Sequence, residues 1–164
     1  MVGRFVKFSS PEIGQDEIDE VIDTLKSGWL TTGKKTQLFE KSFANVIGCK
    51  YAIAVNSATA GLHLALEAVG VGEGDAIITT THTFTATAEV IRYLGADPIF
   101  VDINPEDFNI SIHQVEEKLK AHKNVKAIMP VHFAGQACDM FALRKLCVKY
   151  SVRLVEDAAH ALPT

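Results

Sequence analysis

Apolar and polar residues alternate with the period of an α-helix along the first part of the chain. The pattern predicts a helix over Gln15–Ser27, which Gly28 can end, and a second helix over Thr36–Ile47 that ends before Gly48. The apolar face of the first helix carries Ile18, Val21, Ile22 and Leu25. Between the two helices lies the loop 28–33, which holds two glycines and two threonines.

From Tyr51 onward, short apolar runs alternate with helical patterns. We expect strands at Tyr51–Val55, Ala76–Thr80, Pro98–Val101, Val125–Val131 and Arg153–Glu156. We expect helices at Ala58–Val69, Phe84–Leu94, Ser111–Ala121 and Asp139–Tyr150, with Ser111 as a cap and Gln114 placed for a capping box. This alternation predicts right-handed crossovers and a mostly parallel sheet. The strands are uniformly apolar, as in a sheet covered by helices on both faces, so the fold class is α/β.

Composition and charge narrow the partners of this domain. The chain has 164 residues, 48% of them hydrophobic and 22% charged, which is typical of a soluble globular protein. A net charge of -4 gives no reason to expect nucleic acid, and no apolar run is long enough to span a membrane. The start of the chain lacks the apolar core of a signal peptide. The three cysteines have no metal-ligand spacing, so we expect reduced thiols in a cytoplasmic protein and no metal site.

The end of the last expected strand is the first candidate site. In an open α/β sheet, ligands bind beyond the carboxyl ends of the strands, and Asp157 and His160 follow Arg153–Glu156 at such an end. A carboxylate there is costly to desolvate unless it meets a donor or a cation, and a protonated ring nitrogen of a cofactor is one such cation. The alternative is an ordinary helix start with Asp157 as the N-cap. The segment alone does not decide between them.

Other loops at the same edge of the sheet offer further candidates. Small residues at 56–61 run directly into a helix, where free amides admit an anion and Thr59 adds a hydroxyl, although a plain Ser or Thr cap is an alternative. Phe84 can stack on a flat ring, or it can pack in the core as most phenylalanines do. For His132 we favour a histidine with satisfied hydrogen bonds at a strand end over a ligand contact.

Several segments together resemble one known family. They are Gly28–Gly33, Asn56–Ala65, Thr83-Phe84 with Ala86–Ala88, Leu94–Ala96, Pro130–His132 with Gly135, and Glu156–His160. In order and spacing they resemble the DegT/DnrJ/EryC1/StrS sugar aminotransferases over almost the whole chain. No single segment is specific, but the combination is.

The resemblance implies a pyridoxal-phosphate (PLP) enzyme with the large domain of the aspartate aminotransferase fold (fold type I). Asp157 would pair with the pyridinium nitrogen of the cofactor and keep it protonated. His160 would lie beside the ring near its phenolic oxygen, and Phe84 would stack on the ring. Thr59 and Ala60 match the phosphate-binding turn.

The resemblance also implies a reaction and partners. Members of the family transfer an amino group, usually from glutamate, to a keto group on a nucleotide-linked sugar, in polysaccharide biosynthesis. Trp29, Thr31 and Thr32 match a substrate or subunit-interface loop, which a homodimer shares. On this basis, residues 1–48 form an N-terminal helical segment with an active-site loop, and residues 49–164 form part of the PLP-binding large domain.

The same resemblance predicts what the chain lacks. The Schiff-base lysine and the small C-terminal domain are expected beyond Thr164, so the chain alone is expected to be inactive, and PLP can be absent from it. Two further strands would lie between Tyr51–Val55 and Arg153–Glu156, which leaves both edges unpaired. The absent lysine keeps open a non-catalytic binding or assembly module. A dinucleotide-binding dehydrogenase does not fit, because the dense glycines at 70–74 follow a helix rather than the first strand.

Overall fold

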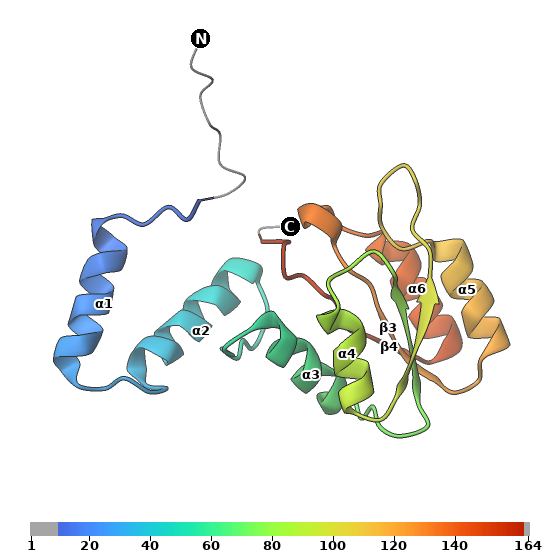
Figure 1. Ribbon diagram of the computed structural model, residues 1–164, viewed down its shortest axis with the longest axis horizontal. Helices are drawn as coiled ribbons and strands as arrows, with labels where there is room; N and C mark the ends of the chain where they lie inside the picture. Colours follow the sequence, from blue (N-terminus) through green and yellow to red (C-terminus); the bar gives the residue numbers. More distant parts are fainter. Residues whose placement is uncertain (1–9, 163–164) are drawn as a thin grey trace, which may run out of the picture. The chain divides into compact units, whose positions relative to one another are not determined.

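The computed structural model describes residues 10–162 and divides into two compact units, with the boundary between Ala54 and Val55 (Figure 1). The first unit contains helix α1 (Gln15–Ser27), as predicted, and helix α2 (Lys34–Ile47). The ammonium group of Lys35 joins the two helices, because it lies 2.5 Å from Glu20 Oε2 and 2.8 Å from Asp23 Oδ2.

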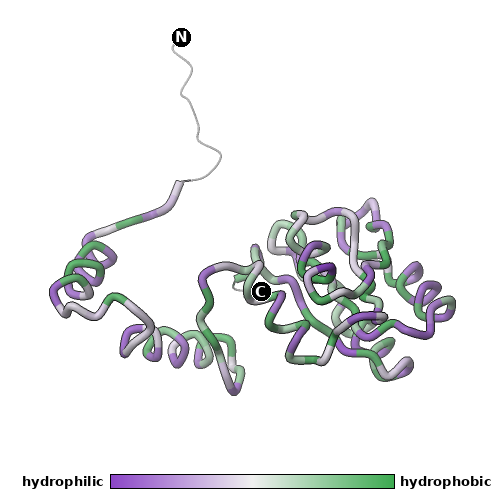
Figure 2. Tube along the Cα trace, turned by 60° about the horizontal axis from the view of Figure 1, so that its bottom comes forward, coloured by the Kyte–Doolittle hydropathy of each residue, from purple (hydrophilic) through white to green (hydrophobic). Residues whose placement is uncertain are grey.

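Neither helix of the first unit buries a residue, although both are amphipathic. Hydrophobic and hydrophilic residues alternate along them (Figure 2). The apolar face of α1 is exposed, since Val21 and Leu25 are 60% and 61% accessible to solvent. The amphipathic pattern and the terminal glycines of these helices are local signals, and no residue from 10 to 162 buries their apolar faces.

The second unit is a four-stranded sheet in the order β2-β1-β3-β4, with every pair of neighbours parallel. The strands are β1 (Ala76–Thr80), β2 (Asp97–Val101), β3 (Val125–Met129) and β4 (Arg153–Leu154). The helices are α3 (Ala58–Ala68), α4 (Ala86–Tyr93), α5 (Ile112–Ala121) and α6 (Met140–Tyr150), with a short 3-10 turn, η1 (Phe133–Gly135), after β3. The predicted α/β class with a parallel sheet is confirmed (Figure 1).

Helices cover both faces of this sheet. Neighbouring residues of a strand point to opposite faces, so Ile77 and Ile78 of β1 enter two different cores. Ile77 packs with Leu66 of α3 and with other residues of α3 and α4, while Ile78 packs with residues of α5 and α6 such as Leu143. This two-sided burial explains why all five residues of β1 are buried.

The strand expected at Tyr51–Val55 is not formed. Tyr51 and Ile53 are 74% and 80% exposed, and no residue from 10 to 162 makes a ladder with this segment. Ala54 N instead donates a hydrogen bond to Glu40 Oε1 at 2.9 Å. An apolar run becomes a strand only when a neighbour supplies the hydrogen bonds, and no neighbour within residues 10–162 does so here.

The expected strands Val125–Val131 and Arg153–Glu156 are shorter than predicted. Proline has no amide hydrogen to donate, so Pro130 ends β3 at Met129, and Val131 forms an isolated bridge with Asp157. Pairing nevertheless continues beyond β4, because Val155 N donates to Ile128 O at 3.0 Å. The two segments therefore stay side by side up to Asp157.

Two expectations at helix starts need correction. The helix predicted from Phe84 begins at Ala86, which leaves Phe84 in the preceding loop. Ser111 caps α5 as expected, but the capping box with Gln114 is wrong. The amide of Ser111 donates to Asp102 O at 3.0 Å, and Gln114 Oε1 accepts from Asp102 N at 2.9 Å. The nearby strand end therefore uses the groups that a capping box needs.

Among residues 10–162, no helix is long and apolar enough to cross a membrane.

Candidate active site

Asp157 lies at the carboxyl end of the sheet with its backbone held on both sides. Its amide donates to Pro130 O at 2.9 Å, and its carbonyl accepts from His132 N at 3.1 Å. These bonds continue the pairing of β3 with β4 beyond the strands themselves. The Asp157 side chain is therefore presented from a rigid part of the fold, and Asp157 is only 6% exposed.

Neutral donors surround the Asp157 carboxylate. Thr87 Oγ1 donates to Oδ2 at 2.8 Å, and Ala159 N donates to Oδ1 at 3.3 Å. Thr83 Oγ1 lies 2.7 Å from Thr87 Oγ1. No Lys, Arg or His among residues 10–162 forms an ion pair with Asp157. Within the described part of the chain, the buried Asp157 carboxylate thus has hydrogen bonds but no counter-charge.

The segment after Asp157 is a turn. Ala161 N donates to Ala158 O at 2.9 Å, and no helix follows Asp157 among the residues described up to 162, so the helix-start alternative is wrong there. His160 is exposed. A Cβ at Gly135 would come within 2.9 Å of His160 O, so the glycine allows η1 and this turn to meet.

Phe84 is 79% exposed in the loop before α4, which rules out the core-packing alternative. Burying an aromatic ring is favourable, and an exposed ring at the ligand end of the sheet is therefore available to a flat partner. Phe84 lies in the same loop as Thr83, whose hydroxyl contacts Thr87 in the first turn of α4. Thr87 in turn donates to Asp157.

The first turn of α3 shows an ordinary cap beside free donors. Ser57 Oγ accepts from Ala60 N at 3.2 Å, which confirms the cap alternative for Ser57. The amides of Ala58 and Thr59 have no acceptor among residues 10–162, as expected for the first residues of a helix. Amides at a helix start favour binding of an anion, so a phosphate-binding site remains compatible with the Ser57 cap.

His132 has its hydrogen bonds satisfied, as we expected. Its Nδ1 accepts from Cys138 N at 3.1 Å, which requires the proton of the neutral ring to be on Nε2. That nitrogen lies 3.0 Å from Glu156 Oε2, to which it donates. The imidazole is buried, and it fastens the loop after β3 to the end of β4. Sequence reasoning did not find Glu156 as its partner.

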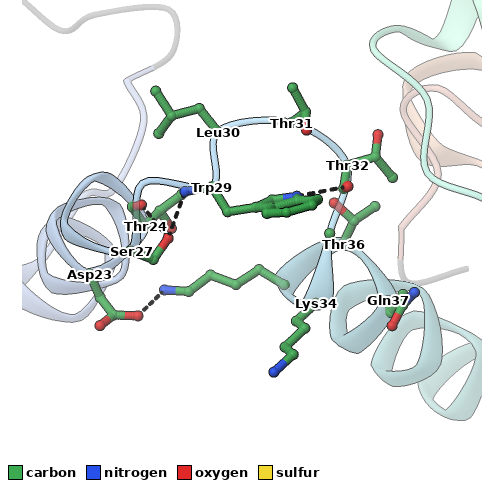
Figure 3. A pocket seen from close by; sticks show the side chains of 12 residues that line it. Asp23, Thr24, Ser27, Trp29, Leu30, Thr31, Thr32, Lys34, Thr36 and Gln37 are labelled. Atoms are coloured by element: carbon green, nitrogen blue, oxygen red, sulfur yellow. Dashed lines mark hydrogen bonds and ion pairs between the residues drawn. The ribbon is translucent and has the colours of Figure 1, made fainter.

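The loop between α1 and α2 holds the remaining predicted residues (Figure 3). Trp29 Nε1 donates to Thr32 O at 3.0 Å, which folds the indole back over the loop. A Cβ at Gly33 would lie 2.5 Å from Trp29 Nε1, so this packing requires glycine. Trp29, Thr31 and Thr32 line a pocket of the first unit with the hydroxyl residues Thr24, Ser27 and Thr36.

The parallel sheet defines an α/β protein, and Asp157 and Thr87 meet at the carboxyl end of its strands, where such folds bind their ligands. Residues 11–164 match the DegT/DnrJ/EryC1/StrS aminotransferase family, and the chain belongs to this family. The family and fold class expected from the sequence are both confirmed.

Relatives of known sequence cover nearly the whole chain. The spore coat polysaccharide biosynthesis protein SpsC of Bacillus subtilis is 48% identical over 161 residues, which are 98% of this chain and 41% of SpsC. A protein of Methanocaldococcus jannaschii, MJ1066, is 50% identical over 152 residues, or 93% of this chain and 39% of the relative. The chain thus spans about two fifths of the length of these relatives.

Solved structures agree with this assignment. The putative sugar aminotransferase Spr1654 from Streptococcus pneumoniae, in its PMP form, superimposes with a TM-score of 0.91 at 36% identity. The match covers 96% of this chain and 43% of Spr1654. The PLP form of the same protein gives a TM-score of 0.90.

Proposed function

We propose that this chain is part of a PLP-dependent aminotransferase that moves an amino group from glutamate to a keto group on a nucleotide-linked sugar. Membership of the family and the likeness to SpsC and Spr1654 support aminotransfer in sugar or polysaccharide biosynthesis. The observation that carries the proposal is the Asp157 carboxylate, which is buried at the ligand end of the sheet without a counter-charge among residues 10–162.

The residues present fit PLP. The donors that the Asp157 carboxylate meets among residues 10–162 are neutral. Such a buried carboxylate suits a protonated ring nitrogen, because an opposite charge offsets the cost of desolvation. The exposed ring of Phe84 suits a flat heterocycle, and the amides that begin α3 suit a phosphate group. When bound, PLP supplies the electron sink that amino transfer needs.

Each residue then has a distinct role in the proposal. Asp157 accepts a hydrogen bond from the ring nitrogen and keeps that nitrogen protonated. Phe84 stacks on the ring and excludes water from one of its faces. Thr59 and Ala60 would form the turn that holds the phosphate, in which Thr59 offers its hydroxyl and its amide while the Ala60 amide donates to Ser57 Oγ. His160 would lie near the phenolic oxygen.

We place the loop with Trp29, Thr31 and Thr32 at the substrate or at the interface of a homodimer. Its pocket combines an aromatic ring with hydroxyl groups, which are the groups that bind sugars. The exposed apolar face of α1 supports association with a second subunit. For the 164-residue chain by itself we propose no amino transfer, since no lysine follows Asp157 in it to anchor the cofactor and carry the proton.

The test is Asp157→Asn in the full-length protein, which removes the charge and keeps the shape. We expect kcat to fall by about 10²-fold or more, the scale known for losing one preorganised electrostatic partner, while the circular dichroism spectrum is unchanged. Asp139→Asn, at an exposed carboxylate on the start of α6, is the matched control and should keep its kcat. A near-normal kcat in the Asp157 variant would show that this carboxylate does not serve the cofactor.

A further inference from the structure

Thr87 stands out because its hydroxyl is buried and reaches across the fold. It lies in the first turn of α4, it is 0% exposed, and its Oγ1 is 2.8 Å from Asp157 Oδ2, seventy positions further along the chain. A second hydroxyl, Thr83 Oγ1, is 2.7 Å from Thr87 Oγ1. Thr83 belongs to the loop before α4, so this loop brings its hydroxyl to the first turn of the helix.

The direction of these hydrogen bonds follows from proton counting. An ionised carboxylate only accepts, so the single hydroxyl proton of Thr87 goes to Asp157. Thr87 must therefore accept from Thr83, and the order of donation is Thr83 to Thr87 to Asp157. Hydrogen bonds in such a chain polarise one another, which strengthens the bond that reaches the charged group.

The two oxygens of Asp157 each receive one neutral donor, from Thr87 and from the amide of Ala159. Each carboxylate oxygen keeps a further lone pair for another partner. Without the Thr87 hydroxyl, the 3.3 Å bond from Ala159 N would be the one remaining hydrogen bond among residues 10–162 that restrains rotation of the carboxylate about its Cβ–Cγ bond.

We infer that Thr87 is a positioning residue that holds the Asp157 carboxylate aimed at the cofactor ring nitrogen, with Thr83 supporting it. This inference rests on the proposed function. Thr87 acts through Asp157 and does not itself contact the cofactor.

The experiment uses the full-length protein and the variant Thr87→Val, which keeps the branched shape and removes the hydroxyl. We expect the dissociation constant of PLP to rise roughly ten- to hundredfold, the size of one hydrogen bond to a charged group. In protein loaded with ¹⁵N-labelled PLP, the pyridine nitrogen signal should move toward the neutral form. Thr87→Ser, which restores a hydroxyl, should bring both readouts back toward the wild type.

Thr79→Val is the matched control, because Thr79 is equally buried but donates to Met129 O in the sheet. This control should lose stability without changing either readout. Thr87→Ala is measured in parallel, so that two different side chains test the loss of the hydroxyl. Wild-type values of both readouts in Thr87→Val or Thr87→Ala would overturn the inference. A wild-type protein that binds no PLP would refute the proposed function, and the inference with it.

Discussion

At the residue scale, burial decides the chemistry of the polar groups near the sheet edge. Cys138 is buried and its Sγ donates to Val131 O at 3.2 Å. Burial disfavours the charged thiolate and raises the pKa of Cys138 from 9.0 to about 11. Burial also raises the pKa of Cys147, whereas Cys49 is exposed. All three thiols are free.

The buried and exposed cysteines should therefore differ in their rates of alkylation. Near pH 8 we expect iodoacetamide to modify Cys49 first and Cys138 at least about 100-fold more slowly. A rise of the Cys138 pKa from 9.0 to about 11 lowers its thiolate fraction about 100-fold, and the thiolate is the form that reacts. Since the thiol stays protonated until the pH approaches 11, raising the pH from 7 to 9 should not equalise the rates. Peptide mass spectrometry follows each site, with the unfolded chain in urea as the control. Equal rates at Cys49 and Cys138 in the folded protein would contradict this expectation.

At the element scale, local signals explain the helices and short strands that the sequence predicted well. Helix α1 and strand β1 have the predicted bounds, because a local period and a terminal glycine or turn define them. Helix α6 begins at a local signal too, since Asp139 Oδ1 accepts from Ala142 N at 2.9 Å. The capping box at Gln114 failed because a strand end, which is remote from local pattern, competes for the same groups.

Asp139→Ala should lower the free energy of unfolding by about 0.5–2 kcal/mol, the usual cost of losing an N-cap acceptor. Asp139→Asn keeps an oxygen acceptor and should cost much less. Urea unfolding of the full-length protein measures both variants. An Asp139→Ala protein as stable as the wild type would mean that the cap does not stabilise α6.

At the scale of the whole molecule, exposed apolar segments and a short edge strand are the features that bear on stability and association. Strand β4 has two residues and, among residues 10–162, pairs only with β3. Tyr51 and Ile53 are largely exposed, in a segment for which the sequence pattern predicts a strand. From the family resemblance we expect two further strands between these segments, and the chain spans about two fifths of the length of its relatives. Unpaired strand edges recruit other chains.

We predict that the 164-residue chain alone associates or is poorly stable, and that its Tyr51–Val55 amides exchange rapidly. In the full-length protein the same amides should be protected, because neighbouring strands would supply their hydrogen bonds. Light scattering and amide hydrogen exchange measure both proteins. A compact monomer of the short chain at high concentration, with strong protection at Tyr51–Val55 and Arg153–Leu154, would show that this placement of the missing strands is wrong.

The sequence by itself determined the α/β class, the family and the position of Asp157 at a strand end, because periodicity and segment order are local or linear properties. Tertiary structure alone decided which side chains meet. Thr87 reaches Asp157 and His132 reaches Glu156 only after α4, β3 and β4 have packed. It also decided that Tyr51–Val55 stays irregular, since a strand needs a hydrogen-bonding neighbour that no local pattern can supply.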